Sequence, residues 1–80
     1  ETYYAEEDYE RAIVEYDALI KGYPESEKIP GALLKQGYAF NEMGDRKAAK
    51  GILELLREKY PKTKEAALAK KKLDEITKKR

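Results

Sequence analysis

The sequence predicts an all-α fold of about four helices, preceded by an N-terminal remnant of another helix. Apolar residues recur at intervals of three and four over most of the chain, which is the spacing of one helical face. Pro24 and Pro61 each end such a pattern, because the proline ring clashes with the preceding helical turn. The segments around these prolines, GYPES and KYPKT, place Tyr60 37 residues after Tyr23. We therefore expect similar helical units to follow one another.

The first helix is predicted between Tyr9 and Tyr23. Charged residues such as Glu10 and Glu15 occupy one side of this helix, and larger apolar residues occupy the other. We expect the tyrosines of the apolar side to pack in the core, because a buried aromatic ring removes a large apolar area from water. The apolar side consists of Tyr9, Ala12, Ile13, Tyr16, Leu19, Ile20 and Tyr23.

The second helix is predicted to begin between Lys28 and Pro30, since proline in the first turn loses no helical hydrogen bond. Gly37 lies inside this helix, where glycine is unfavourable, so we expect a neighbouring helix to approach closely there. The helix should end at Gly44, and Asp45 should cap the helix that follows. Its larger apolar residues are Leu33, Leu34, Tyr38, Phe40 and Met43.

The last two helices are predicted over residues 46–59 and from residue 64 onward. Pro61 ends the third helix, and Thr63 is a favourable N-cap for the fourth. The apolar positions of the third helix are Ala49, Ile52, Leu53, Leu55, Leu56 and Tyr60. Those of the fourth helix are Ala66, Ala69, Leu73 and Ile76, beneath a surface rich in lysine.

Residues 8–26 match residues 45–63 at the offset of 37. A helical hairpin of this kind cannot bury its apolar face alone, so neighbouring units must stack on it. The matched pairs include Asp8 with Asp45, Ala12 with Ala49, Tyr16 with Leu53, Leu19 with Leu56, and Ser26 with Thr63.

The composition points away from catalysis. The chain has neither cysteine nor histidine, which removes disulfides, imidazole bases and the commonest metal ligands, and we expect no catalytic residue, metal or cofactor. We expect no membrane insertion, because no run approaches the roughly 20 apolar residues of a span. Charge runs from 2 basic and 9 acidic residues in 1–27 to 9 basic and 3 acidic in 59–80. This basic C-terminal segment could bind an anionic polymer, but a solvated helix face explains it better, and we expect no nucleic-acid partner.

The second and third helices resemble a tetratricopeptide repeat. The residues that carry this resemblance are Leu33, Gly37, Phe40, Gly44, Asp45, Ala49, Leu53 and Pro61, whereas Gln36, Arg46 and Lys50 depart from the usual pattern. The resemblance implies a right-handed α-solenoid fragment built of helical hairpin repeats. It also implies a non-enzymatic scaffold that binds a protein or peptide through a concave face.

The segment from Pro24, which ends one helix, to Gly37, inside the next, is longer than the same segment in a repeat of about 34 residues. With this spacing, nearly the whole chain is similar to the C-terminal repeat domains of TolA-binding, Tol-Pal-associated cell-division coordinators. That resemblance implies a periplasmic location and a TolA-like partner. Repeat lipoproteins of outer-membrane assembly are similar more loosely and remain an alternative.

We expect a single repeat domain over residues 1–80. Residues 1–27 would form a truncated first repeat, residues 28–61 a full repeat and residues 62–80 a C-terminal capping helix. Most of the first repeat's leading helix is absent, so Tyr9 and Ile13 should lack a covering neighbour. Residues 2–22 could instead form one continuous helix, and the truncated repeat could support a homo-oligomer.

The resemblance places the candidate binding residues on the first helix of each repeat, which lines the concave surface. Leu34, Tyr38 and Asn41 follow the spacing i, i+4, i+7 and should form one stripe. This stripe could hold a peptide, or it could pack against a neighbouring repeat, and the sequence does not choose between the two. The predicted binding residues are Tyr4, Gly31, Leu34, Tyr38, Asn41, Glu42 and, at the edge of the groove, Lys71.

Overall fold

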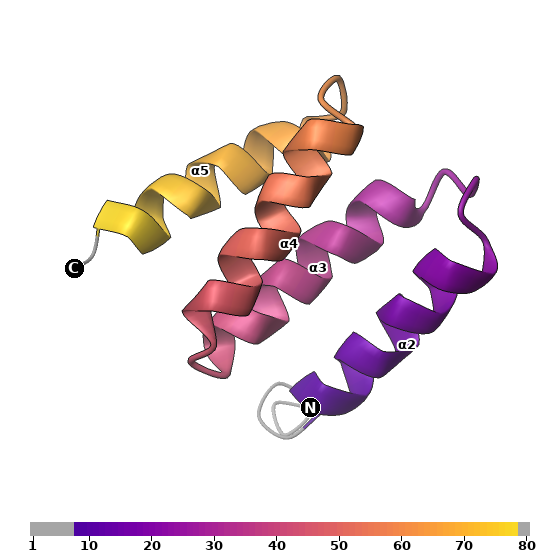
Figure 1. Ribbon diagram of the computed structural model, residues 1–80, viewed down its shortest axis with the longest axis horizontal. Coiled ribbons are helices and arrows are strands. Elements are labelled where there is room, and N and C mark those ends of the chain that lie inside the picture. Colours follow the sequence, from indigo (N-terminus) through magenta and orange to yellow (C-terminus); the bar gives the residue numbers. More distant parts are fainter. Residues whose placement is uncertain (1–7, 79–80) are drawn as a thin grey trace.

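The computed structural model describes residues 8–78, and this part of the chain is all-α, as predicted. Its helices are α2 (Tyr9–Gly22), α3 (Ile29–Glu42), α4 (Arg46–Lys59) and α5 (Lys64–Lys78), shown in Figure 1. Each helix begins within a residue or two of its predicted start, and α2, α3 and α4 also end within a residue or two of their predicted ends. Tyr4, the N-terminal remnant and the start of the alternative helix over residues 2–22 lie outside the described residues.

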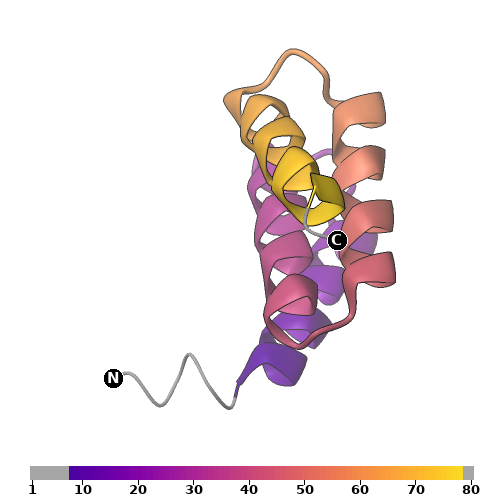
Figure 2. The ribbon, with the colours of Figure 1, turned by 90° about the vertical axis from the view of Figure 1, so that its left-hand side faces the viewer.

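Consecutive helices are antiparallel, and α3 lies at the centre of the arrangement. It contacts α2, α4 and α5, and α5 also packs on α4. The view in Figure 2 places α3 and α5 on one side of the molecule and α4 on the other. Among the described helices, α2 contacts α3 alone. Among the described helices, α2 therefore packs on one neighbour, whereas α5 packs on two.

The turns use the residues that the sequence predicted for them. Gly44 has a φ of 89°, and the backbone N–H of Asp45 donates to the carbonyl of Phe40 at 2.9 Å, which closes α3 as glycine caps commonly do. The Asp45 side chain then accepts a hydrogen bond from the N–H of Ala48. Thr63 accepts one from the N–H of Ala66 at 3.1 Å and so caps α5.

The core lies where α4 is covered by α3 and α5. Ala49, Leu53 and Leu56 of α4 are 0% exposed. An added Cβ on Gly37 would lie 2.5 Å from a methyl group of Leu53, so the absent side chain permits the close approach of α3 to α4. This confirms the predicted reason for the glycine. The apolar positions predicted for α5 are also buried, namely Ala66, Ala69, Leu73 and Ile76.

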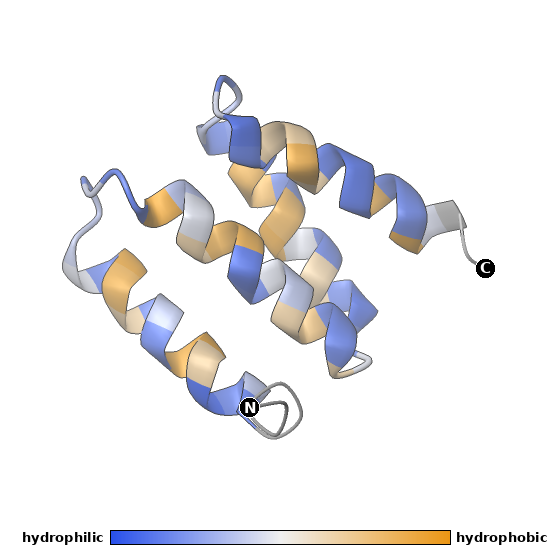
Figure 3. Ribbon diagram, turned by 180° about the vertical axis from the view of Figure 1, so that it is seen from behind, coloured by the Kyte–Doolittle hydropathy of each residue, from blue (hydrophilic) through white to orange (hydrophobic). Residues whose placement is uncertain are grey.

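On the apolar side of α2, Tyr23 is covered less than predicted. Tyr23 is 67% exposed, whereas its counterpart Tyr60 is partly buried against the core. No residue of α2 is buried, although hydrophobic residues run along it in Figure 3 as they do along the inner helices. The prediction that Tyr23 packs in the core is wrong, because α3 is the one described helix that contacts α2.

Candidate binding site

An open groove runs between α2 and α3, formed by two adjoining pockets that share Tyr16 and Lys35. We call it the α2–α3 groove. The pockets measure about 330 and 380 Å³. One wall comes from α2 through Tyr9, Ala12, Tyr16 and Leu19, and the other comes from α3 through Gly31, Ala32, Lys35, Tyr38, Ala39 and Glu42.

The helical repeat explains why these side chains line one groove. Ala12, Tyr16 and Leu19 follow the spacing i, i+4, i+7, so they fall on one face of α2. Small residues of α3 lie opposite, at Gly31 and Ala32, and leave room between the two helices. The groove therefore offers an aromatic and aliphatic surface between two helices.

The rim of the α2–α3 groove is charged. Lys35 is exposed and borders both pockets, with Asp8 and Glu42 at one end and Glu27 and Lys28 at the other. Apolar walls with a charged rim can bury the apolar side of a peptide while its polar side stays hydrated. Within residues 8–78 no cluster of three or more carboxylates gathers as a metal site would require.

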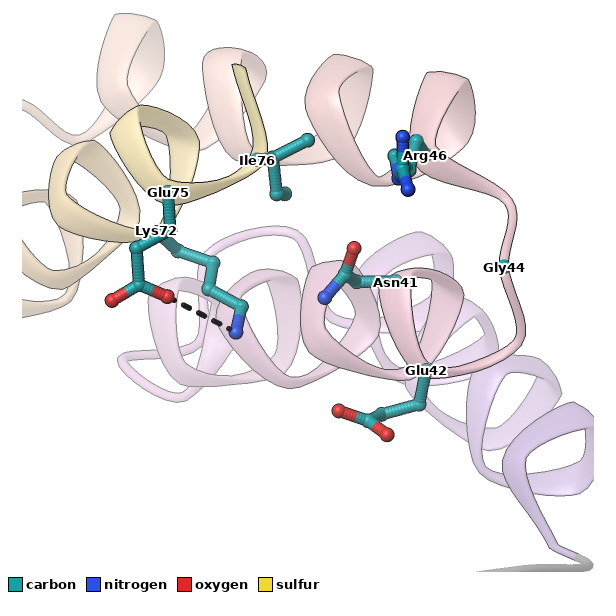
Figure 4. Close-up of a pocket in the computed structure, with 7 residues that line it drawn as sticks. All are labelled: Asn41, Glu42, Gly44, Arg46, Lys72, Glu75 and Ile76. Carbon is teal, nitrogen blue, oxygen red and sulfur yellow. Dashed lines mark hydrogen bonds and ion pairs between the residues drawn. The ribbon is translucent and has the colours of Figure 1, made fainter. Parts of the chain in front are cut away.

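A second pocket of about 360 Å³ lies where the end of α3 meets α4 and α5. Asn41 and Ile76 point toward it, whereas Glu42 points to the other side of α3 (Figure 4). Lys72 forms an ion pair with Glu75 at 3.4 Å, and its Nζ lies 5.4 Å from the centre of the Tyr38 ring. The charges around this pocket largely balance, with Arg46 and Lys72 against Glu42 and Glu75.

The structure places some of the predicted binding residues in the α2–α3 groove and others in the second pocket. Gly31 and Tyr38 line the α2–α3 groove, Asn41 lines the second pocket, and Glu42 borders both. Lys71 is exposed but lines neither, and Tyr4 lies outside the described residues. That these residues bind a partner stays a prediction.

Leu34, the first residue of the predicted stripe of Leu34, Tyr38 and Asn41, is buried. Leu34 is 8% exposed and belongs to the hydrophobic core, together with Leu73 and Ile76 of α5. The stripe could either hold a peptide or pack against a neighbouring repeat, and Leu34 has the second of these roles. The physical reason is that α5 packs along α3 and covers this part of its surface.

Sequence reasoning did not name Ala12, Tyr16 or Lys35 as candidates, although all three line the groove. A signal for the first two was present. Ala12 and Tyr16 match Ala49 and Leu53 of α4 at the repeat offset, so they occupy positions that a further helix covers elsewhere in the chain. No comparable sequence signal marks Lys35, because an exposed lysine on a helix is common.

Comparison with known proteins identifies the repeat. The family model of the tetratricopeptide repeat matches residues 1–26 and 31–63. The chain belongs to the tetratricopeptide repeat family. Tetratricopeptide repeats are generally non-catalytic protein–protein interaction modules, which agrees with a groove that offers apolar surface. A search of curated proteins found no match, and neither did a search of solved structures. Within residues 8–78, no helix combines the length and the apolar character needed to cross a bilayer.

Proposed function

We propose that this tetratricopeptide repeat chain is a non-enzymatic interaction module of a periplasmic scaffold, and that it binds a TolA-like protein. The observation that carries the binding role is the open α2–α3 groove, in which Tyr16 and Tyr38 face a space that no described residue fills. The partner and the compartment are supported by the similarity of the GYPES and KYPKT spacing to Tol-Pal-associated repeat domains.

The groove has the chemistry of a protein-binding surface. Tyrosine is enriched among the residues that dominate binding energy, because its ring contributes large contact area with few rotatable bonds. The Tyr38 ring is already held beneath Lys72, so binding would cost little further side-chain entropy there. Lys35 at the rim supplies a charge that can orient a partner.

Binding of an anionic polymer by the basic segment is less well supported. Lys70 pairs with Asp74 at 3.7 Å and Lys72 pairs with Glu75, so two of the lysines on α5 face carboxylates of the same helix. Intrahelical pairs of this kind reduce the local positive field that phosphate groups would meet. The groove is therefore the stronger candidate.

The test is a titration of the ¹⁵N-labelled chain with the C-terminal domain of TolA. We expect saturable shifts at the backbone amides of Tyr16, Gly31 and Tyr38. Tyr16→Lys should weaken binding by about tenfold or more, as loss of a central aromatic contact does. Val14→Lys is the matched control, because Val14 lies on the same helix, is 65% exposed and lines neither pocket of the groove.

Circular dichroism of both variants should show unchanged helix content, so that a loss of binding is not a loss of fold. Shifts that avoid the groove, or no shifts at millimolar TolA domain, would contradict the proposed partner. Equal weakening by Tyr16→Lys and Val14→Lys would contradict the proposed site.

A further inference from the structure

One side of α4 points away from the core. Ala49, Leu53 and Leu56 form the buried stripe of this helix, and α3 and α5 pack against it. With about 3.6 residues per turn, Gly51 lies on the opposite side, where an added Cβ would meet nothing within 4 Å. In Figure 2, α4 forms one edge of the molecule. We call this exposed side the outer face of α4, and its residues are Lys47, Gly51, Glu54, Leu55 and Glu58.

Several residues of the outer face are unfavourable for α4 by itself. Gly51 lowers helix propensity at an exposed position where no close contact compensates it. Lys47 lies in the first turn and Glu58 in the last, which reverses the order that the helix dipole favours. Glu54 and Glu58 are four positions apart and place like charges side by side. Within residues 8–78, none of these charged side chains forms an ion pair. Such departures from local rules are typical of a functional contact.

The equivalent helix α2 shows that the repeat does not require these residues. At the offset of 37, the residues of α2 that stand where Lys47, Gly51 and Glu58 stand on α4 are Glu10, Val14 and Lys21. The acidic residue of α2 is in its first turn and the lysine is in its last, which is the favourable order. Val14 is exposed, so a side chain is accommodated at the position of the glycine. The outer face of α4 therefore has a requirement that α2 does not share.

We propose that the outer face of α4 binds the same face of a second copy of the chain, with the two α4 helices antiparallel and crossing at Gly51. A two-fold axis brings the N-terminal half of one α4 beside the C-terminal half of the other. Lys47 of each copy then meets Glu54 and Glu58 of the other copy, so the contact is complementary in charge. Glu54 and Glu58 border an open hollow of about 380 Å³, which gives the lysine side chain room.

The residues near the crossing point suit close packing. The distance between two packed helices depends on the side chains at their contact, and Gly51 contributes no side chain. Leu55, one turn further along, is 38% exposed and can pack over Gly51 of the other copy. Arg46 and Arg57 lie about 120–140° around the helix from Gly51, so they point away from the contact. The crossing point is therefore apolar and small, with the complementary charges on either side of it.

A second copy is the occupant that these charges favour. A matching helix must carry acidic residues where α4 carries Lys47, and a lysine where α4 carries Glu54 and Glu58. The same helix in the antiparallel direction meets this requirement, whereas a parallel contact would place Lys47 on Lys47. A contact between single helices is smaller than the 1,200–2,000 Å² of a stable interface, so we expect a weak dimer.

This inference goes beyond the proposed function and does not depend on it. No residue of the outer face of α4 lines either pocket of the α2–α3 groove. Dimerisation therefore leaves the groove open, and one dimer would present two grooves to partner proteins.

The test is sedimentation velocity of the chain at low ionic strength. We expect a monomer at micromolar concentration and a dimer with a dissociation constant of about 0.1–1 mM. The amides of Gly51 and Leu55 should shift over the same concentration range. Gly51→Gln should weaken association by at least about tenfold, because its side chain separates the helices. Val14→Gln, at the equivalent place on α2, is the matched control and should leave association unchanged. Glutamine is the better helix former at both positions, so neither variant should lose its fold.

Charge reversal tests the antiparallel register. Lys47→Glu and Glu58→Lys should each abolish the dimer at about 1 mM, because each places like charges across the two-fold axis. An equimolar mixture of these two variants should form a dimer, because every pair across the contact is then opposite in charge. Both changes give α4 a charge that its dipole favours, so a loss of association is not a loss of fold.

Four results would overturn the inference. A chain that stays monomeric at about 1 mM is the first. The second is a dimer that survives Gly51→Gln, and the third is a mixture of the two charge variants that stays monomeric. The fourth is a dimer that Tyr16→Lys breaks and Gly51→Gln does not, which would place the contact on the first repeat. Binding of the TolA domain should be the same for Gly51→Gln as for the unchanged chain, so the proposed function and the dimer can fail separately.

Discussion

Replacing Gly37 by alanine should destabilise the protein, although alanine is the better helix former. In an isolated helix the change would gain about 1 kcal/mol. In the folded protein the new Cβ would lie 2.5 Å from Leu53 Cδ2 and 2.7 Å from Leu53 Cγ, where ordinary contact begins at 3.4 Å. Leu53 is fully buried, so it cannot rotate into solvent to make room.

Forcing extra volume into a packed core costs about 1–3 kcal/mol. Since the helix propensity of alanine offsets about 1 kcal/mol of this, we expect Gly37→Ala to lower the free energy of unfolding by up to about 2 kcal/mol. In a domain of this size, each kcal/mol corresponds to about 4–8 °C in Tm. The loss should therefore be clear in both thermal and urea denaturation.

Gly51→Ala is the matched control. Gly51 also lies inside a helix, but an added Cβ there would meet nothing within 4 Å. This variant should gain about 0.5–1 kcal/mol from helix propensity alone. Circular dichroism during urea denaturation, analysed with a common slope, measures both variants on one scale.

A double-mutant cycle with Leu53→Ala identifies the cause. Leu53→Ala alone should cost about 2–5 kcal/mol, because it leaves a cavity in the core. With Gly37→Ala already present, the same change should cost less, since it also removes the clash, and the coupling should reach about 1–3 kcal/mol. Additive effects, or a Gly37→Ala protein as stable as Gly51→Ala, would refute the role assigned to the close approach of α3 and α4.

Further changes test the turns and the two tyrosines in the same denaturation assay. Thr63→Ala should cost about 1 kcal/mol, because it removes the acceptor for the Ala66 N–H at the start of α5. Gly44→Ala should cost about 1–2 kcal/mol, since its φ of 89° is unfavourable for a residue with a Cβ. Tyr60→Ala should cost at least about 2 kcal/mol more than Tyr23→Ala, because Tyr60 packs against the core and Tyr23 does not. Equal losses for the two tyrosines would contradict the difference in packing.

The helix boundaries were predictable because they depend on interactions between residues close in sequence. Proline ends a helix through its own ring, Gly44 accepts a positive φ because it lacks a Cβ, and Thr63 caps the turn that follows it. These causes act over four residues or fewer. The close approach at Gly37 was also predictable, since a glycine inside a helix is unfavourable without a compensating contact. The short distance to Leu53 confirms this prediction.

The binding site was less predictable, because its exposure depends on which helices pack together. Leu34 and Tyr38 are one helical turn apart, yet Leu34 is buried and Tyr38 is partly open. The sequence offered a binding role and a packing role for both. The position of α5 over Leu34 decides the question for that residue.

By itself the sequence determined the helical class, the helix limits, the repeat and the glycine through which α3 approaches α4, because these follow from local stereochemistry and periodicity. Only the tertiary structure decided which of two equivalent apolar stripes is covered. Ala49, Leu53 and Leu56 are buried because α3 lies over them, whereas Ala12, Tyr16 and Leu19 line an open groove. Whether a residue is buried depends on which helices pack around it. Equivalent residues can therefore form the core in one repeat and a candidate binding surface in the other.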